Sequence, residues 1–300
     1  MCYWIAVRLP VSVPAMNRLR IVVLTSLSVG MMSACAAILG IDDPPPVGRP
    51  AEDGSTSPER DGASDALDGS ELESDACPPG PPDAAEMVRT DVSCIDPYEV
   101  TQLDYAAFLG SKKGDVSGQP AECASNTSYV PLGGFPPKPT SVPITWIDWC
   151  DATAYCTWAG KRLCGAVDGG ALPLDRMATV DDEWFMACSH DNDGLHELPY
   201  SNGYDPRACN GPENDAGGAV PVGSMKKCEG GFVGLFDMSG NVREWIASCG
   251  VDRDGGRTCG TRGGAYYDNP SSSLYCSRNP TAPADLQNVG IGFRCCASAR

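Results

Sequence analysis

Sixteen cysteines in 300 residues constrain this chain more than any other feature. A reducing cytosol seldom keeps so many thiols, so the count predicts an oxidising compartment and a fold held by disulfides. Sixteen less Cys2 and Cys35 leaves fourteen, an even number consistent with seven bridges. Sequence alone does not fix the connectivity. Short-range candidates are Cys150–Cys164, Cys209–Cys228 and Cys249–Cys259, with Cys77, Cys94, Cys123 and Cys296 left to be assigned.

The charge balance excludes one broad class of partner. The formal net charge is −17 and the isoelectric point lies near 4.4, whereas a nucleic-acid binder needs a basic face. A mean hydropathy of −0.20 gives no sign of a multi-pass membrane protein. A chain of 300 residues has room for one large domain with tails or for two small domains.

Residues 1–35 have the features of an export signal. A short basic stretch at 16–20 precedes an apolar run, Ile21 to Met32, that is too short to span a bilayer. Met32-Ser-Ala-Cys35 resembles the lipobox of bacterial lipoproteins, which implies lipidation of Cys35 and a membrane anchor. Met16 is an alternative start, and a plain secretory signal cut near Ala34 is the competing interpretation. The signal and the lipobox lead us to expect the cell envelope as the location. The outer membrane is preferred because Ala36 is not the aspartate that retains lipoproteins in the inner membrane of many enteric bacteria.

Residues 36–82 are expected to form a disordered tether. Between Ile41 and Ala76 there are 11 acidic and 2 basic residues, a net charge of −9, with several prolines and no aromatic residue. Such a segment buries too little apolar surface to offset its conformational entropy. Repulsion between its like charges extends it, so its simplest role is to hold a domain away from the membrane.

Residues 83–298 are predicted to form one α+β domain, loop-rich and stapled by disulfides. Thr101 to Leu109 is predicted to be a helix, with Thr101 as its N-cap and Gly110 as its stop. Apolar residues at helical spacing between Trp149 and Leu163 predict a second helix capped by Asp148. The segment 179–182 is predicted to cap a third. Gly, Pro and Asn elsewhere favour brief strands and long loops.

Six sequence motifs occur in the order found in one known family. They are Asp96-Pro-Tyr-Glu-Val-Thr101, the segment from Pro143 to Leu163, Pro221-Val-Gly-Ser224, Gly234-Leu-Phe-Asp-Met-Ser-Gly-Asn-Val-Arg-Glu-Trp245, Arg262-Gly-Gly264 and Gly292-Phe-Arg-Cys295. Together they resemble the formylglycine-generating enzymes, or sulfatase-modifying factors. The resemblance implies a variant of the C-type-lectin-like fold with little regular structure. It also implies disulfides Cys156–Cys295 and Cys188–Cys276.

The active-site positions depart from that family. Its enzymes oxidise a sulfatase cysteine to formylglycine with Cu(I) held by two cysteine thiolates, the soft ligands that Cu(I) prefers. Here the first copper cysteine falls on Asp268 and the second within 269–273, where there is no cysteine. A family serine is replaced by Ala265 and a tryptophan by Arg243. Copper and the oxidase activity are therefore not expected.

Calcium is the cofactor that the resemblance does support. The family's ligands fall on the side chains of Asp237 and Glu244 and on the carbonyls of Gly240 and Val242, a set of hard oxygens suited to Ca²⁺. A weaker second site would fall near Asn210, Gly211 and Asn214 or Asp215. The competing interpretation is that Asp237 and Glu244 cap loops or pair with Arg243. Zinc is not expected, because there is no Cys-x-x-Cys and only two histidines.

Two functions of different classes remain open from the sequence. The first is a non-catalytic binding or scaffold module whose former active-site cleft recognises an envelope protein, a peptide or a glycan. That cleft would be lined by Arg243, Ala265, Tyr266, Tyr267 and Asp268. The alternative is an active family enzyme that oxidises cysteine or runs another reaction in the same cleft. The number of free thiols distinguishes the two.

Overall fold

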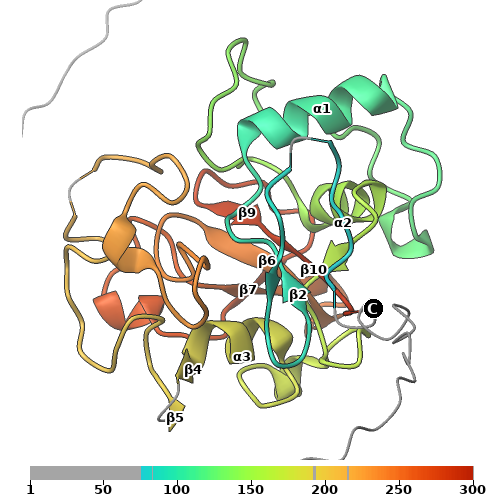
Figure 1. Ribbon diagram of the computed structural model, residues 1–300. Helices are drawn as coiled ribbons and strands as arrows, with labels where there is room; N and C mark the ends of the chain where they lie inside the picture. Colours follow the sequence, from blue (N-terminus) through green and yellow to red (C-terminus); the bar gives the residue numbers. More distant parts are fainter. Residues whose placement is uncertain (1–75, 83, 192–193, 215, 300) are drawn as a thin grey trace, which may run out of the picture. The chain divides into compact units, whose positions relative to one another are not determined.

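The computed structural model describes residues 76–82, 84–191, 194–214 and 216–299 (Figure 1). These residues form short strands and helices joined by long loops, as the α+β prediction requires. The first sheet has the order β1-β2-β10-β3 and the second the order β8-β7-β6-β9, with β4 and β5 as a separate pair. The strands are β1 (Val88–Arg89), β2 (Cys94–Ile95), β3 (Arg162–Leu163), β4 (His190–Asp191), β5 (Gly194–Leu195), β6 (Arg243–Val251), β7 (Arg257–Arg262), β8 (Thr281–Pro283), β9 (Ile291–Phe293) and β10 (Cys295–Ala297).

The three α-helices of the described residues begin at side-chain caps that were predicted from the sequence. In α1 (Gln102–Lys112), Thr101 accepts a hydrogen bond from the backbone N–H of Asp104, and Asp104 accepts one in return. Asp148 and Asp151 form the same box at α2 (Trp149–Trp158). Asp182 caps α3 (Glu183–Ser189). Short 3₁₀ turns lie at Ala121–Cys123, Leu174–Arg176, Lys226–Cys228 and Ser271–Leu274.

Two helix ends differ from the prediction. Gly110 does not stop α1, which continues to Lys112 and ends where Lys113 adopts a left-handed backbone with φ of 51°. A Cβ added at Gly110 would have no heavy atom within 4 Å, so a larger residue would fit at this position. Helix α2 ends at Trp158, and Leu163 belongs to β3 instead. Gly160, with φ of 72°, makes the turn between them.

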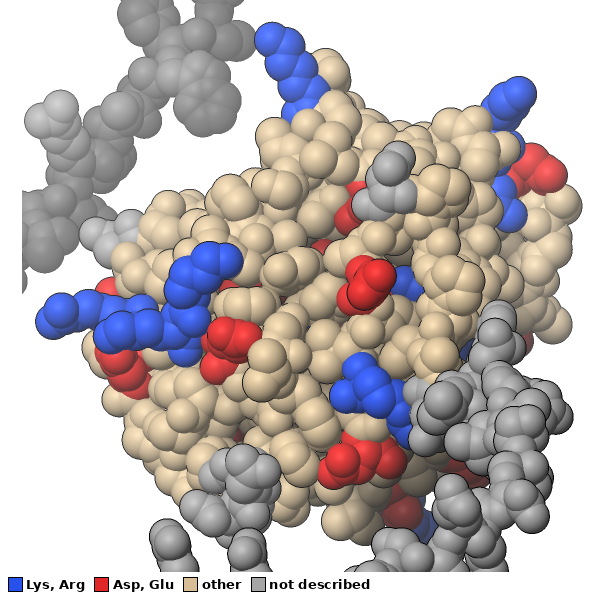
Figure 2. Space-filling view, in the orientation of Figure 1, with Lys and Arg blue, Asp and Glu red and all other residues tan. Residues whose placement is uncertain are grey.

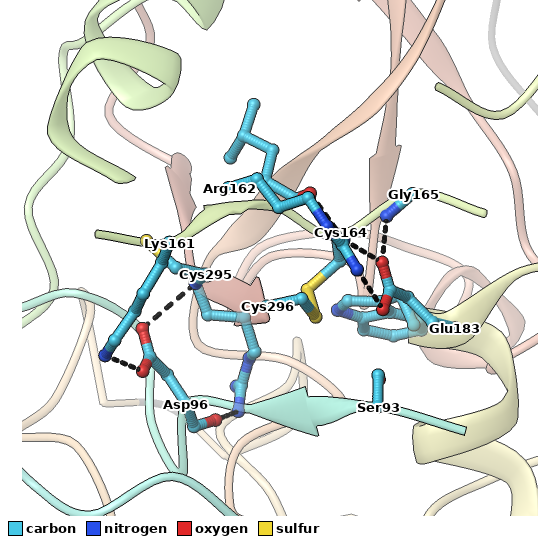
Figure 3. Close-up of a disulfide and its surroundings, with 12 residues drawn as sticks. Ser93, Asp96, Lys161, Arg162, Cys164, Gly165, Glu183, Cys295 and Cys296 are labelled. Atoms are coloured by element: carbon cyan, nitrogen blue, oxygen red, sulfur yellow. Dashed lines mark hydrogen bonds and ion pairs between the residues drawn. A yellow bond between two sulfur atoms is a disulfide. The ribbon is translucent and has the colours of Figure 1, made fainter. Parts of the chain in front are cut away.

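Seven disulfides link the fourteen cysteines that the structure describes. The bridges are Cys77–Cys94, Cys123–Cys150, Cys156–Cys295, Cys164–Cys296, Cys188–Cys276, Cys209–Cys228 and Cys249–Cys259. The predicted pairing of Cys150 with Cys164 is therefore wrong, whereas the other four predicted pairs are confirmed. The physical reason is strand pairing. Strand β10 lies antiparallel to β3, which places Cys296 beside Cys164 (Figure 3).

The core has two main hydrophobic clusters. The larger packs aromatic side chains of α1 and α2 around Phe293, with Tyr155 and Phe108 in ring contact. The second gathers around Trp184 of α3 and includes the Cys164–Cys296 and Cys188–Cys276 bridges. Strand β6 contributes to both clusters, Trp245 to the first and Ile246 to the second.

Several predictions fall where the structure gives no description. The export signal, Cys35, residues 36–75 of the tether and Asp215 all lie outside the described residues. Within the described ranges, no helix combines the length and the apolar character needed to cross a membrane. In the view of Figure 2, acidic and basic side chains are scattered in small groups over a largely uncharged face.

Candidate functional site

Arg243 and Asp268 form a two-point ion pair at the positions where the family resemblance places active-site residues. Arg243 opens β6, and its Nε donates to Asp268 Oδ2 at 2.6 Å while its Nη2 pairs with Oδ1. Asp268 is only 7% exposed, and its Oδ2 also accepts the backbone N–H of Ala265 at 2.8 Å. Burial lowers the pKa of Arg243, but the hydrogen bonding and the negative charge of Asp268 together outweigh burial, and the pKa is raised. A charged guanidinium and a carboxylate therefore fill this position.

Two tyrosines lie beside this ion pair. The rings of Tyr266 and Tyr267 meet edge to face at 4.9 Å between centroids. Tyr267 is 40% exposed, and its hydroxyl donates to Asn288 Oδ1 at 2.8 Å. A Cβ at Gly290 would lie 2.4 Å from that hydroxyl, so glycine is required for the ring to sit there. The predicted cleft residues Arg243, Ala265, Tyr266, Tyr267 and Asp268 are thus brought together, and we call them the Arg243–Asp268 region.

The donor set does not fit Cu(I). Every cysteine from Cys77 to Cys296, all within the described ranges, is in a disulfide and has no thiolate to offer. Cys276, the nearest cysteine in sequence to Asp268, is bound to Cys188. The Arg243–Asp268 region presents a carboxylate, a guanidinium and phenols in place of soft ligands.

The loop between Asp237 and Glu244 has the sharp turn that the calcium hypothesis requires. Asp237 and Gly240 adopt left-handed backbones, with φ of 58° and 78°. A Cβ at Gly240 would lie 2.4 Å from the carbonyl oxygen of Asn210, so glycine is required at this close approach. Asp237 is buried, and its Oδ2 accepts the backbone N–H of Gly223 at 2.6 Å. Its Oδ1 is buried with no hydrogen-bond partner.

Glu244 has a different environment from Asp237. Both of its carboxylate oxygens accept hydrogen bonds at 2.8 Å from Arg294, the arginine of the Gly-Phe-Arg-Cys motif, and Oε2 also accepts the indole N–H of Trp184 at 2.7 Å. The predicted alternative partner, Arg243, pairs with Asp268 instead. Glu244 therefore anchors α3 and β9–β10 to β6, and its charge is already compensated by Arg294.

Glu99 is the residue that sequence reasoning missed. It is 1% exposed, and neither carboxylate oxygen has a hydrogen-bond partner. Burial and the neighbouring charge of Asp237 raise the pKa of Glu99 well above its usual range. Burial likewise raises the pKa of Asp237 to about 6. Glu99 stands in the motif Asp96-Pro-Tyr-Glu-Val-Thr101, which would have been the signal.

These orphaned oxygens fit a hard cation. Three buried carboxylate oxygens on Asp237 and Glu99 lack partners, and carboxylate and carbonyl oxygens are the donors that Ca²⁺ prefers. Among the described residues, no three His, Cys, Asp or Glu side chains converge as a metal cluster. The main-chain carbonyls of Gly240 and Val242 would have to complete the set.

The weaker calcium candidates lie in a network of amides. Asn210 Nδ2 donates to Asn241 Oδ1 at 3.1 Å, and Asn210 Oδ1 accepts from Asn214 Nδ2 at 3.2 Å. A Cβ at Gly211 would lie 2.7 Å from Leu274. Asn210 therefore serves to join the loop at 210–214 to the loop at 237–242.

A comparison with protein families agrees with the motifs. The model of the sulfatase-modifying factor enzyme 1-like domain matches residues 63–299. The chain belongs to this family. Its fold is the family's loop-rich, disulfide-stapled α+β domain.

The curated relatives include active and inactive members. The formylglycine-generating enzyme of Mus musculus is 27% identical over 277 residues, covering 71% of this chain and 68% of that protein. The formylglycine-generating enzyme of Thermomonospora curvata is 30% identical over 191 residues, covering 52% and 55%. The inactive Cα-formylglycine-generating enzyme 2 of Mus musculus is 28% identical over 177 residues, covering 53% and 50%. The chain thus spans about half the length of the last two.

Solved structures are more distant. PvdO from Pseudomonas aeruginosa aligns with a TM-score of 0.47 at 18% identity, covering 69% of this chain and 80% of that chain. CarF aligns with a TM-score of 0.44 at 20% identity, covering 69% and 86%.

Proposed function

We propose that this protein is a non-catalytic binding or scaffold module of the cell envelope. The observation that carries the proposal is the Arg243–Asp268 ion pair, which occupies the position where the family's chemistry needs a thiolate. The exposed Tyr267 and the half-buried Arg243 offer an aromatic face and hydrogen-bond donors to a peptide, glycan or protein partner. Inactive family members among the relatives support this class of function.

The location is part of the same proposal. The signal-like residues 1–35 would export the chain, Cys35 would carry the lipid anchor, and the acidic segment would hold the domain off the membrane. Seven disulfides suit an oxidising envelope compartment. We place the anchor in the outer membrane by preference.

Calcium would act in this protein as a structural cofactor. Asp237 and Glu99 would hold the ion with the carbonyls of Gly240 and Val242, while Arg294 keeps Glu244 oriented. The ion would supply positive charge to two buried carboxylates that have no hydrogen-bond donors. Its role would be to stiffen the loop that leads into β6 and so to position Arg243.

The alternative is an active family enzyme, and a thiol count tests it. The full-length chain is expressed through an oxidising compartment, alkylated without reduction and mapped by peptide mass. We expect no label on any cysteine from Cys77 to Cys296, and no oxidation of a sulfatase-derived cysteine peptide by the copper-treated protein. Two labelled cysteines near 262–276 together with oxidation of that peptide would overturn the proposal.

Binding is tested separately by crosslinking in intact cells. Replacing Arg243, Tyr266, Tyr267 and Asp268 with alanine should abolish the crosslinks formed by the wild-type chain. The matched control replaces Arg253 and Asp254, which lie in the exposed turn between β6 and β7, and should leave them intact. Unchanged crosslinks in the first variant would show that the Arg243–Asp268 region does not contact the partner.

A further inference from the structure

A cavity lies toward the opposite end of β6 from Arg243. It has a volume of about 270 Å³ and opens among α2, β3, β6 and β7. Trp149, Leu163, Ala171, Ala247 and Cys249 supply much of its wall. Cys249 is six residues along the strand from Arg243, which is about 20 Å at the rise of a β-strand. The cavity is therefore separate from the Arg243–Asp268 region.

One cationic side chain in this wall has unused hydrogen-bond donors. The guanidinium of Arg257 lies over the Trp149 ring, 4.8 Å from its centroid, which fixes its orientation. Its Nε is buried and has no hydrogen-bond partner. The nearest carboxylate, Glu122, is 3.8 Å from Nη2, beyond hydrogen-bond distance. Because this nitrogen has almost no accessible surface, an acceptor from outside the chain would meet the terminal nitrogens of Arg257, for which the described residues provide no hydrogen bond.

Three other polar side chains of the wall already have hydrogen-bond partners. Arg162 pairs through its two terminal nitrogens, Nη1 and Nη2, with Glu183 (Figure 3). The hydroxyls of Thr153 and Thr157 donate to carbonyls one turn back in α2. Glu183 thus holds Arg162 closely, whereas Glu122, which also lines the cavity, forms only a long ion pair of 3.8 Å with Arg257 and leaves its guanidinium without a hydrogen bond to the described residues.

We propose that this cavity binds a small amphiphilic carboxylate. Its apolar body would pack on Leu163 and Ala247, and its carboxylate would accept hydrogen bonds from Arg257. An apolar cavity with a few convergent polar groups is the usual form of a small-molecule site, and the planar guanidinium matches a carboxylate. The volume, at the small end for such sites, suits a short chain rather than a long lipid. This site does not depend on the proposed function of the Arg243–Asp268 region.

Calorimetric titration of the full-length protein with octanoate tests the proposal. Octylamine, which has the same apolar chain and the opposite charge, is the matched ligand and should not bind. From hexanoate to octanoate, each added methylene should tighten binding about fourfold. Failure of octanoate to bind at millimolar concentration, or equal binding of octylamine, would overturn the proposal.

Two variants locate the bound octanoate. Arg257→Gln should weaken binding at least tenfold, on the order expected for a lost charged hydrogen bond. Arg253→Gln removes an exposed guanidinium from the neighbouring turn and should leave binding unchanged. Ala171→Phe fills the cavity from an exposed position, so the fold should persist while binding is lost. Wild-type affinity in either Arg257→Gln or Ala171→Phe would refute the assignment.

Discussion

Asp268 joins the start of β6 to the loop that follows β7. Its carboxylate accepts from the guanidinium of Arg243 and from the backbone N–H of Ala265, while its own N–H donates to the Ala265 carbonyl at 2.9 Å. The family resemblance implies a metal-binding thiolate at this position, and the chain has a buried acid there instead. The contact joins the start of β6 to the segment that carries Tyr266 and Tyr267.

Breaking this ion pair should destabilise the domain. We expect Asp268→Asn to lower the free energy of unfolding by about 2–3 kcal/mol, because Arg243 is left half-buried without a countercharge. Urea denaturation monitored by tryptophan fluorescence measures the change. Asp254→Asn, in an exposed turn, is the control and should stay within about 0.5 kcal/mol of wild type. A loss in Asp268→Asn no larger than the control's would contradict the role of the pair.

The disulfides should differ in what they contribute to stability. Cys156–Cys295 spans 139 residues and Cys249–Cys259 spans 10. The comparison needs a background in which Cys164 and Cys296 are alanine, because their bridge otherwise closes nearly the same loop as Cys156–Cys295. In that background Cys188–Cys276 still shortens the first loop to about 50 residues, so in the loop-entropy model replacing both cysteines of the first pair with alanine costs about 4 kcal/mol and of the second about 3 kcal/mol. Denaturant midpoints of the two variants measure the difference. If both variants lose the same free energy of unfolding, or if the short-loop variant loses more, then strain or packing determines the contribution of each disulfide, and loop length does not.

Local signals were easier to interpret than long-range ones. The sequence predicted the caps at Thr101 and Asp148 because a capping box involves residues three positions apart. The pairing of Cys150 with Cys164 was wrong because spacing says nothing of strand order: β10 returns from the far end of the chain to lie beside β3. The family resemblance supplied two long-range pairs, Cys156–Cys295 and Cys188–Cys276, that spacing could not.

The candidate site likewise has residues that the sequence predicted and contacts that only the fold produces. The motifs predicted the residues of the Arg243–Asp268 region, but the ion pair between them could be seen only in the folded structure. Arg257 escaped prediction because a single charged residue gives no pattern, and Glu99 escaped it because its motif does not show that the side chain is buried. Only the packing around Glu99 leaves its carboxylate without donors, and only the stacking on Trp149 orients Arg257.

Calcium should stabilise the wild-type chain, and Glu99→Gln should separate the metal's effect from that of the fold. Without calcium, we expect Glu99→Gln to raise the melting temperature near neutral pH, because it removes a buried carboxyl whose pKa is raised well above its usual range and which therefore costs stability at that pH. With calcium, the order should reverse, since a hundredfold excess over the dissociation constant adds about 2.7 kcal/mol to the wild type alone. Scanning calorimetry with calcium or with a chelator measures both. Equal calcium responses in the two proteins would remove Glu99 from the site.

Asp151 should make stability fall as pH rises. Burial, reinforced by the charge of Asp148, raises the pKa of Asp151 to about 8. The folded chain therefore keeps a proton on this carboxyl that the unfolded chain releases near pH 4. Between these values each pH unit lowers the free energy of unfolding by at most about 1.4 kcal/mol, and the loss levels off above the folded pKa.

The variant Asp151→Ser isolates this titration. Serine at this position retains a short polar side chain in the first turn of α2 but has no carboxyl to titrate. It also loses the hydrogen bond from Asn126, measured at 2.8 Å, which lowers stability at every pH. The difference in unfolding free energy between wild type and variant should therefore shrink from pH 5 to pH 8. Parallel pH profiles of the two proteins would show that Asp151 is already ionised throughout this range.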